Sequence, residues 1–484
     1  MLHPMHFEKR DLYQEIKKEI EAQGYTLSSL SQKMSVNRGL LSGSLNRLSK
    51  PIPISLMDRL ALALDHPEGW LYPEYIEECF QEGKAHWRRI KALLLRCLDL
   101  KKHDLVNTIL DRLMEEPQHL AAVFKMAEEL FLEGRRTDSI PFYRCVIENE
   151  IKQHSERFAI SHYRWFRAEI SKKLDVEGYQ EAVMRFAPFR RRLPEPYQLD
   201  GLLHLANACF LLHKWDEVRD LAAEMLSLVK LILNRNKNRK RKENKTEYSI
   251  ERHLVVYYGH SYLLCGNTLE KQGKFEQALE YVSAYQDLSW FDDLDDSGRE
   301  DVRRFSIFAD ANRLNLYILM GKFEYLSEYL AFLDRHPEEK LPGLLTLLES
   351  SLYHQENIDT ILPYFQQDIT ELVTRMDEDE GRTYYAPSFH RNHCTQLLYG
   401  LAIYSITRGR LEEGIDYLLL ALQQCFSSNN KHLAIVCAAW FEKCRDQVSR
   451  NQVERYETIM EGVIQNEKMD VGFVAGPRYQ RFDY

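Results

Sequence analysis

Apolar residues recur at three- and four-residue spacing through long windows of the chain, which is the pattern of amphipathic helices. Runs of alternating apolar and polar residues, which are typical of strands, are not evident. Glycine and proline interrupt helices, and they number only 21 and 15 among 484 residues. An all-helical chain of this length does not easily close around one core, so the pattern favours helical repeats.

A short motif recurs where one expected helix ends and the next begins. A small polar turn is followed by a lysine with an aromatic residue, or by an arginine, and a small or apolar residue stands three positions further on. The clearest copy runs from Gly273 to Ala278, with the sequence GKFEQA. Other copies begin at Lys102, Gly134, Gly178, His213, Gly321 and Gly409.

The spacing of these copies, about 32 to 60 residues or multiples of it, lies near the tetratricopeptide period with insertions. The segment from Leu264 to Ala278 resembles the tetratricopeptide consensus, and the other copies match it less closely. The resemblance implies a right-handed helical solenoid of about seven to nine helical hairpins. An irregular helical bundle is the alternative.

In the first part of the chain the expected helices are shorter, and residues typical of turns separate them. Helices are expected at residues 11–23, 27–34, 38–48 and 55–64. A short helix, a three-residue turn and a second helix have the geometry of a helix-turn-helix. We therefore predict an N-terminal helix-turn-helix domain ahead of the solenoid, within one all-α chain.

Apolar residues of the second and third helices would pack these helices together and leave a polar face on the third helix. That face carries no acidic residue. An acidic side chain there would be repelled by the phosphates of the DNA duplex. The residues predicted to contact base edges or phosphates are Thr26, Asn37, Arg38, Ser42, Asn46 and Arg47. A purely structural three-helix cap is the alternative.

Residues 27–64 resemble the helix-turn-helix of the phage-repressor-like family called XRE. Leu30, Met34, Val36, Arg38, Leu41 and Ser42 match the usual pattern of that family. The chain departs from the pattern at Ser31, Ser35 and Ser44, and Gly39 and Gly43 leave two reading positions without side chains.

Three asparagines occupy the same register in the repeats. Asn207, Asn267 and Asn315 each lie eight residues before the aromatic residue that opens a second helix. This position in a tetratricopeptide pair faces the concave groove, where an amide can both donate to and accept from a peptide backbone. We predict a peptide-binding surface formed by these asparagines together with His260, Lys271 and Asn312. Chance, or exposure along the groove wall, is the alternative.

An XRE-like module followed by a tetratricopeptide array is similar to the RNPP family of peptide-sensing regulators in Gram-positive bacteria and to the arbitrium receptors of phages. The resemblance implies a homodimer on a palindromic operator in double-stranded DNA. It also implies a short signalling peptide, of the quorum-sensing type, that changes dimer geometry and DNA binding.

Composition narrows these expectations. Apolar residues make up 44% and charged residues 28%, without a membrane-spanning run or a signal peptide, so we expect a cytoplasmic protein. Nine scattered cysteines favour buried thiols over disulfides or zinc ligands. The net charge of -9 restricts any DNA-binding surface to a local patch. The basic run 234–245 is expected to form a loop of unassigned role.

The sequence contains no motif of catalytic or metal-ligating residues that is typical of an enzyme. The cluster from His390 to Cys394 lacks a partner pair for a metal, and no phosphate-binding loop or nucleophile elbow is evident, so we expect neither catalysis nor a cofactor. We predict a DNA-binding domain at 1–72, a linker helix at 73–84, a repeat domain at 85–470 and a tail at 471–484. The alternative function is a protein-interaction scaffold that binds a response-regulator or phosphorelay protein, with little DNA binding.

Overall fold

A computed structural model describes most of the chain. The described residues are 11–45, 52–80, 85–152, 154–172, 176–239, 251–291, 294–374, 387–427 and 430–470. Within these ranges the regular elements are α-helices and short 3-10 helices, and no strand is present. The prediction of an all-α fold is therefore confirmed.

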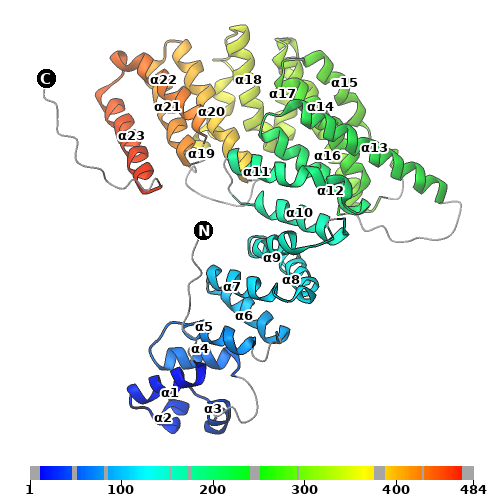
Figure 1. The fold of residues 1–484 in the computed structure, drawn as a ribbon. Coiled ribbons are helices and arrows are strands. Elements are labelled where there is room, and N and C mark those ends of the chain that lie inside the picture. The colour runs from blue at the N-terminus through cyan, green and yellow to red at the C-terminus, as the bar shows by residue number, and fades with distance from the viewer. Residues whose placement is uncertain are drawn as a thin grey trace. The chain divides into compact units, whose positions relative to one another are not determined.

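The chain divides into two compact units, Met1–Gly201 and Leu202–Tyr484. Unit 1 begins with five helices and continues as consecutive helix pairs (Figure 1). Its elements are α1 Leu12–Ala22, α2 Leu27–Lys33, α3 Arg38–Leu45, α4 Ile54–Ala63, α5 Tyr72–Cys79, α6 Trp87–Asp99, α7 His103–Leu113, η2 Pro117–His119, α8 Leu120–Leu132, α9 Arg136–Asn149, α10 Glu156–Glu169, α11 Val176–Phe186 and η3 Ala187–Arg192. Helix α12, Glu195–Leu211, starts in unit 1 and continues into unit 2.

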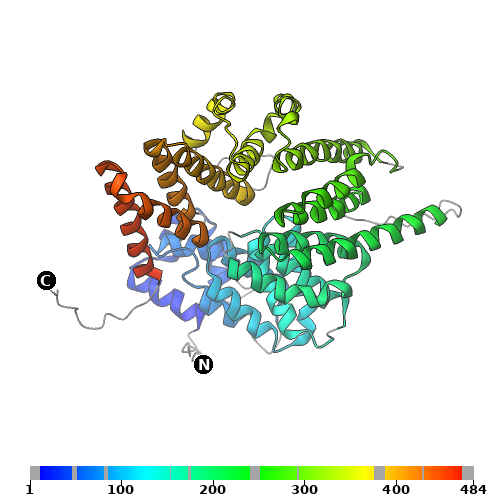
Figure 2. The same ribbon diagram turned by 90° about the horizontal axis from the view of Figure 1, so that it is seen from above.

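Unit 2 consists of further helix pairs that follow one another in chain order along a curved row (Figure 2). Its elements are α13 Trp215–Arg239, α14 Leu254–Lys271, α15 Phe275–Gln286, α16 Asp296–Leu319, η4 Phe323–Tyr325, α17 Leu326–Arg335, η5 Pro337–Glu339, α18 Lys340–His354, η6 Leu362–Phe365, α19 Gln366–Thr374, α20 Pro387–Thr407, α21 Leu411–Ser427, α22 Lys431–Cys444, η7 Arg445–Gln447 and α23 Arg450–Asp470. Helices α13 to α16 each pack on the next, as do α20 to α22, which is the arrangement of a helical solenoid.

The turn between α14 and α15 explains why the junction motif recurs. Gly273 has a φ of +71°, a left-handed conformation that glycine adopts without strain. The next residue, Lys274, donates its backbone N–H to the carbonyl of Leu269 at 2.9 Å, which closes the end of α14. The same geometry recurs at Lys101, Gly134, His213, Gly321 and Gly409. The predicted junctions at these positions are confirmed.

Two predicted features are wrong. Gly178 does not mark a junction, because α11 already begins at Val176 with Glu177 in its first turn, where a carboxylate favours the helix. Residues 234–239 of the basic run are also not a loop, because α13 continues to Arg239. The arginines and the lysine of residues 234–239 are good helix formers, and they let the long helix extend although asparagines alternate with them. Residues 240–245 lie outside the described part of the chain.

Apolar residues from neighbouring pairs form continuous cores within unit 2. One cluster joins Leu347, Phe365, Leu401 and Phe441, and another surrounds Tyr285. The nine cysteines are free thiols, and all except the half-buried Cys394 are buried, as predicted from their apolar surroundings. Burial of this kind accounts for their positions without a chemical role.

Candidate functional site

Helices α2 and α3 are joined by a short turn at the place where a helix-turn-helix is predicted. Thr26 caps α2 through a reciprocal pair with Ser29, in which each side-chain oxygen accepts from the other residue's backbone N–H, at 3.2 and 3.0 Å. In the turn, Ser35 has a φ of +53° and Val36 donates to the carbonyl of Ser31 at 3.0 Å. The helices pack through the buried side chains of Leu30, Met34, Leu41 and Leu45.

Fewer of the predicted polar side chains are exposed on α3 than the sequence analysis expected. Arg38 is exposed, Ser42 is half-buried, and the Asn37 side chain caps the helix by accepting from Gly39 N–H at 2.7 Å. Leu40 of α3 is 54% exposed, an apolar contribution that the polar pattern did not predict. The other two predicted DNA contacts, Asn46 and Arg47, lie outside the described residues.

Charge is separated between α1 and the helix-turn-helix. Residues 26–45 contain Lys33 and Arg38 and no acidic residue, whereas acidic residues lie on α1 and at its cap, and Asp65 lies 3.6 Å from the ammonium group of Lys33. Lys33 donates to the hydroxyl of Tyr25 at 2.8 Å, and that hydrogen bond raises the pKa of the ammonium group, so it stays charged. Lys33 is thus a cation that the sequence analysis did not assign to DNA binding, and it is paired with Asp65.

In unit 2, the predicted asparagine row consists of residues with different surroundings. Asn207 on α12 is exposed, and Asn267 on α14 is half-buried. Asn315 on α16 accepts a hydrogen bond from the hydroxyl of Tyr329, and Asn312 donates to the hydroxyl of Tyr285 at 2.9 Å. These two amides link α16 by hydrogen bonds to both of its neighbours, α15 and α17. They therefore also stabilise the packing of the repeats.

The remaining predicted peptide contacts also have partners within unit 2. Lys271 is 3.3 Å from Glu270, and although burial lowers its pKa, Glu270 and Glu349 raise it more strongly. Burial raises the pKa of Glu349, which sequence reasoning did not select. His260 contacts the Phe305 ring edge-to-face at 5.3 Å, and burial, assisted by nearby cations, lowers its pKa to about 4. It is therefore a neutral, packed side chain at pH 7.

A separate cleft of about 1120 Å³ opens between α19, the start of α21 and the connection from α22 to α23. Its lining residues are Gln366, Ile369, Thr370, Val373, Thr374, Gly409, Arg410, Leu411, Glu412, Glu413, Asp416, Tyr417, Leu420, Gln447, Val448, Ser449 and Gln452. The lining thus combines apolar side chains, hydroxyls, amides and carboxylates. No pattern along the sequence pointed to this site, because the contributing segments are far apart in the chain.

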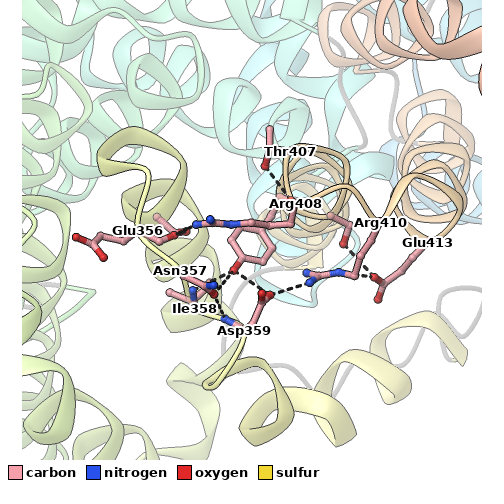
Figure 3. Close-up of polar contacts among 11 residues, drawn as sticks. Glu356, Asn357, Ile358, Asp359, Thr407, Arg408, Arg410 and Glu413 are labelled. Atoms are coloured by element: carbon pink, nitrogen blue, oxygen red, sulfur yellow. Dashed lines mark hydrogen bonds and ion pairs between the residues drawn. The ribbon is translucent and has the colours of Figure 1, made fainter.

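A polar network supports one edge of this cleft (Figure 3). Arg410 donates to Asp359 at 2.8 Å and to Glu413 at 3.1 Å, and these bonds join the turn after α18 to the start of α21. The Tyr404 hydroxyl contacts the same turn through Asp359, at 3.1 Å, and the backbone N–H of Ile358, at 3.0 Å. Burial would raise the pKa of Asp359, but its bonds to Arg410 and Tyr404 hold it below the usual range.

Within the described residues, no cluster of histidine, cysteine and carboxylate side chains could hold a metal ion, and no helix has the length and apolar character of a membrane span. The side chains of residues 390–393 lie outside the described part of the chain.

Comparisons with protein families and with curated proteins find no match. A solved structure described as a circular tandem repeat protein with novel repeat topology and enhanced subunit contact surfaces aligns with 11% identity and a TM-score of 0.18. That alignment covers 94% of this chain and 100% of the other. The all-α assignment rests on the helices of this chain itself.

Proposed function

We propose that the chain is a DNA-binding transcription regulator and that its helical-repeat domain senses a short peptide. The observation that carries the proposal is the capped α2–turn–α3 unit, in which Arg38 and Leu40 of α3 are exposed. A helix-turn-helix places the start of its second helix against base edges in the major groove. Arg38 is the first residue of α3 and therefore occupies the position from which side chains reach the bases.

The charge distribution supports this use of α3. Lys33 and Arg38 are the charged residues of segment 26–45, and DNA affinity depends largely on such cations near phosphates. A face with so few cations binds one half-site weakly. Two copies on a palindromic operator, as the resemblance to peptide-sensing regulators implies, would multiply the two contacts.

The sensing surface in this proposal is the first-helix face that carries Asn267, Lys271 and Asn315. Asn267 is half-buried, and no hydrogen bond of its amide is found within the described residues, so the amide is available to a peptide backbone. Asn315 uses its oxygen for Tyr329, which leaves its amide hydrogens as donors. A peptide that contacts α14 and α16 together would favour one spacing of these helices over another.

A binding titration of the full chain tests the DNA contact. The probe is a labelled duplex from the region upstream of the gene, and the variants are Arg38→Ala and Lys18→Ala. Both remove one exposed cation, but Lys18 lies on α1. We expect Arg38→Ala to weaken binding by about 1–3 kcal/mol per site and Lys18→Ala to have a much smaller effect. Equal effects of the two variants would contradict the assignment of α3.

The second candidate function is a protein-interaction scaffold. It is favoured by the Asn37 side chain, which caps α3, and by Gly39 and Gly43, which bring no side chain to the reading face. Absence of any binding to the upstream duplex at low salt would favour this function instead.

A further inference from the structure

The cleft between α19 and α21 has the size of a site for a chain segment. Its volume of about 1120 Å³ exceeds the range of about 300–1,000 Å³ that is common for small-molecule pockets. The cleft is lined by α19 and α21, each of which is the second helix of a helix pair. The asparagine row lies on α12, α14 and α16, each of which is the first helix of its pair. An occupant of the cleft would therefore contact different helices from a peptide bound at the asparagines.

Apolar side chains line two walls of the cleft. Ile369 and Val373 stand one turn apart on α19, and Tyr417 and Leu420 stand on α21. Ile369 is buried in the core of unit 2, and the other three are half-buried, so each keeps some apolar surface within reach of a ligand. Burial of that surface favours an occupant with apolar side chains of its own.

The charges in the cleft favour a cationic occupant. The lining contains three carboxylates, on Glu412, Glu413 and Asp416, and one guanidinium, on Arg410. Arg410 is already bonded to Glu413 and to Asp359, which lies outside the lining, so it does not neutralise the remaining carboxylates. Asp416 pairs with Arg455 at 2.7 Å, whereas the exposed Glu412 carboxylate has no ion pair among the described residues.

Hydroxyls and amides complete the lining and suit a peptide backbone. Thr370 and Thr374 lie on the α19 wall, and Gln447 and Ser449 lie on the connection between α22 and α23. The Gln447 amide can donate and accept. The hydroxyls of Thr370 and Thr374 donate to backbone carbonyls of α19, and that of Ser449 donates to Gln452, so these hydroxyls can accept from the N–H groups of an extended backbone. An anionic ligand such as a nucleotide would meet the carboxylates and be repelled.

We propose that this cleft binds a short amphipathic segment of a partner protein that combines lysine or arginine with apolar side chains. The proposal goes beyond the proposed function and does not depend on it. It adds a protein partner to a chain whose DNA and signalling-peptide contacts use α3 and the first helices of unit 2.

Three labelled hexapeptides test the charge preference. Each contains three leucines, alternating with three lysines, three glutamines or three glutamates. We expect the lysine peptide to bind the full chain at least about tenfold more tightly than the other two at low salt, because only it complements the carboxylates. Equal affinities for the three peptides, or no binding of the lysine peptide, would overturn the proposal.

Two matched pairs of variants locate the binding. Thr370→Trp fills the cleft from an exposed position of α19, whereas Gln367→Trp places the same side chain outside the lining. Glu412→Gln removes a cleft carboxylate at the second residue of α21, whereas Glu276→Gln removes one at the second residue of α15. Because all four positions are exposed, the variants should retain the wild-type helical content.

We expect Thr370→Trp to weaken the lysine peptide at least about tenfold and Glu412→Gln to weaken it about threefold, with the matched variants within about twofold of wild type. Equal losses within both pairs would overturn the proposal, because they would show general attraction to a chain with net charge -9. The Glu412 pair decides the outcome if Thr370→Trp disturbs the fold.

Discussion

In unit 1, charged side chains are buried along the middle of α10, whereas the ion pairs beside the cleft of unit 2 lie at the surface. Arg167 and Asp200 are 4% and 1% exposed, and the Tyr163 hydroxyl bonds to both. Arg410 and Asp359 in unit 2 are 36% and 39% exposed. The buried pair is fully committed to the fold, while the carboxylates around the exposed pair remain accessible to a partner.

The largest expected effect breaks the buried pair. Arg167→Met removes a buried guanidinium that bonds to Asp200 and Tyr163, which costs about 3–5 kcal/mol, whereas Arg410→Met should cost about 0–1 kcal/mol because that pair is solvated. Hydrogen exchange of the α10 and α21 amides reports the two units separately. Similar losses of protection in the two variants would contradict the difference between the units.

A change of pH should also affect unit 1 through His162. Its ring is 8% exposed, stacks on Phe189 at 3.9 Å, and has no hydrogen-bond partner within the described residues. Burial, then Arg185 and Arg192, lower its pKa to about 4. Above pH 6.5 the ring is neutral in both states; below that value the unfolded chain binds the proton first, so unfolding becomes easier.

Between pH 7 and pH 5 this group alone should remove about 2 kcal/mol of stability, at about 1.4 kcal/mol per pH unit below 6.5. His162→Phe keeps the ring stacking and should abolish that loss, as measured by hydrogen exchange of α10 at the two pH values. An unchanged pH dependence in the variant would show that His162 does not titrate in this way.

A smaller difference in stability is expected between variants of two asparagines that occupy the same register in unit 2. Asn315→Ala removes the nearer acceptor of the buried Tyr329 hydroxyl, which keeps only the Gly343 carbonyl at 3.4 Å, and should cost about 1–2 kcal/mol, whereas Asn267→Ala should change stability by less than about 0.5 kcal/mol. Thermal unfolding of the two variants measures the difference. Equal destabilisation would mean that Asn267 also supports the repeats and is not reserved for a ligand.

The fold was predictable where local chemistry determines it. Helical periodicity and left-handed turn residues such as Gly273 predicted most junctions, because each depends on a few neighbouring residues. Gly178 misled the prediction because a glycine can also lie inside a helix. The basic run after residue 233 misled the prediction because polar composition alone does not end a helix: Arg235, Lys237 and Arg239 are good helix formers even though asparagines alternate with them.

The candidate sites were predictable only in part. The helix-turn-helix spacing placed Arg38 at the start of α3, but the bond from Asn37 back to its own helix was not anticipated. The bond between Asn312 and Tyr285 depends on how α15 packs against α16, and the cleft depends on the separation of α19 from α21. Such features arise from tertiary packing, which periodicity does not specify.

A footprint of the full chain on the duplex upstream of its gene tests the central claim most directly. A dimeric regulator should protect two half-sites one helical turn apart, about 10 base pairs centre to centre, and Arg38→Ala should remove both protected regions while Lys18→Ala leaves them. A duplex that stays uniformly accessible at saturating protein and low salt would contradict the assignment of this chain as a DNA-binding regulator.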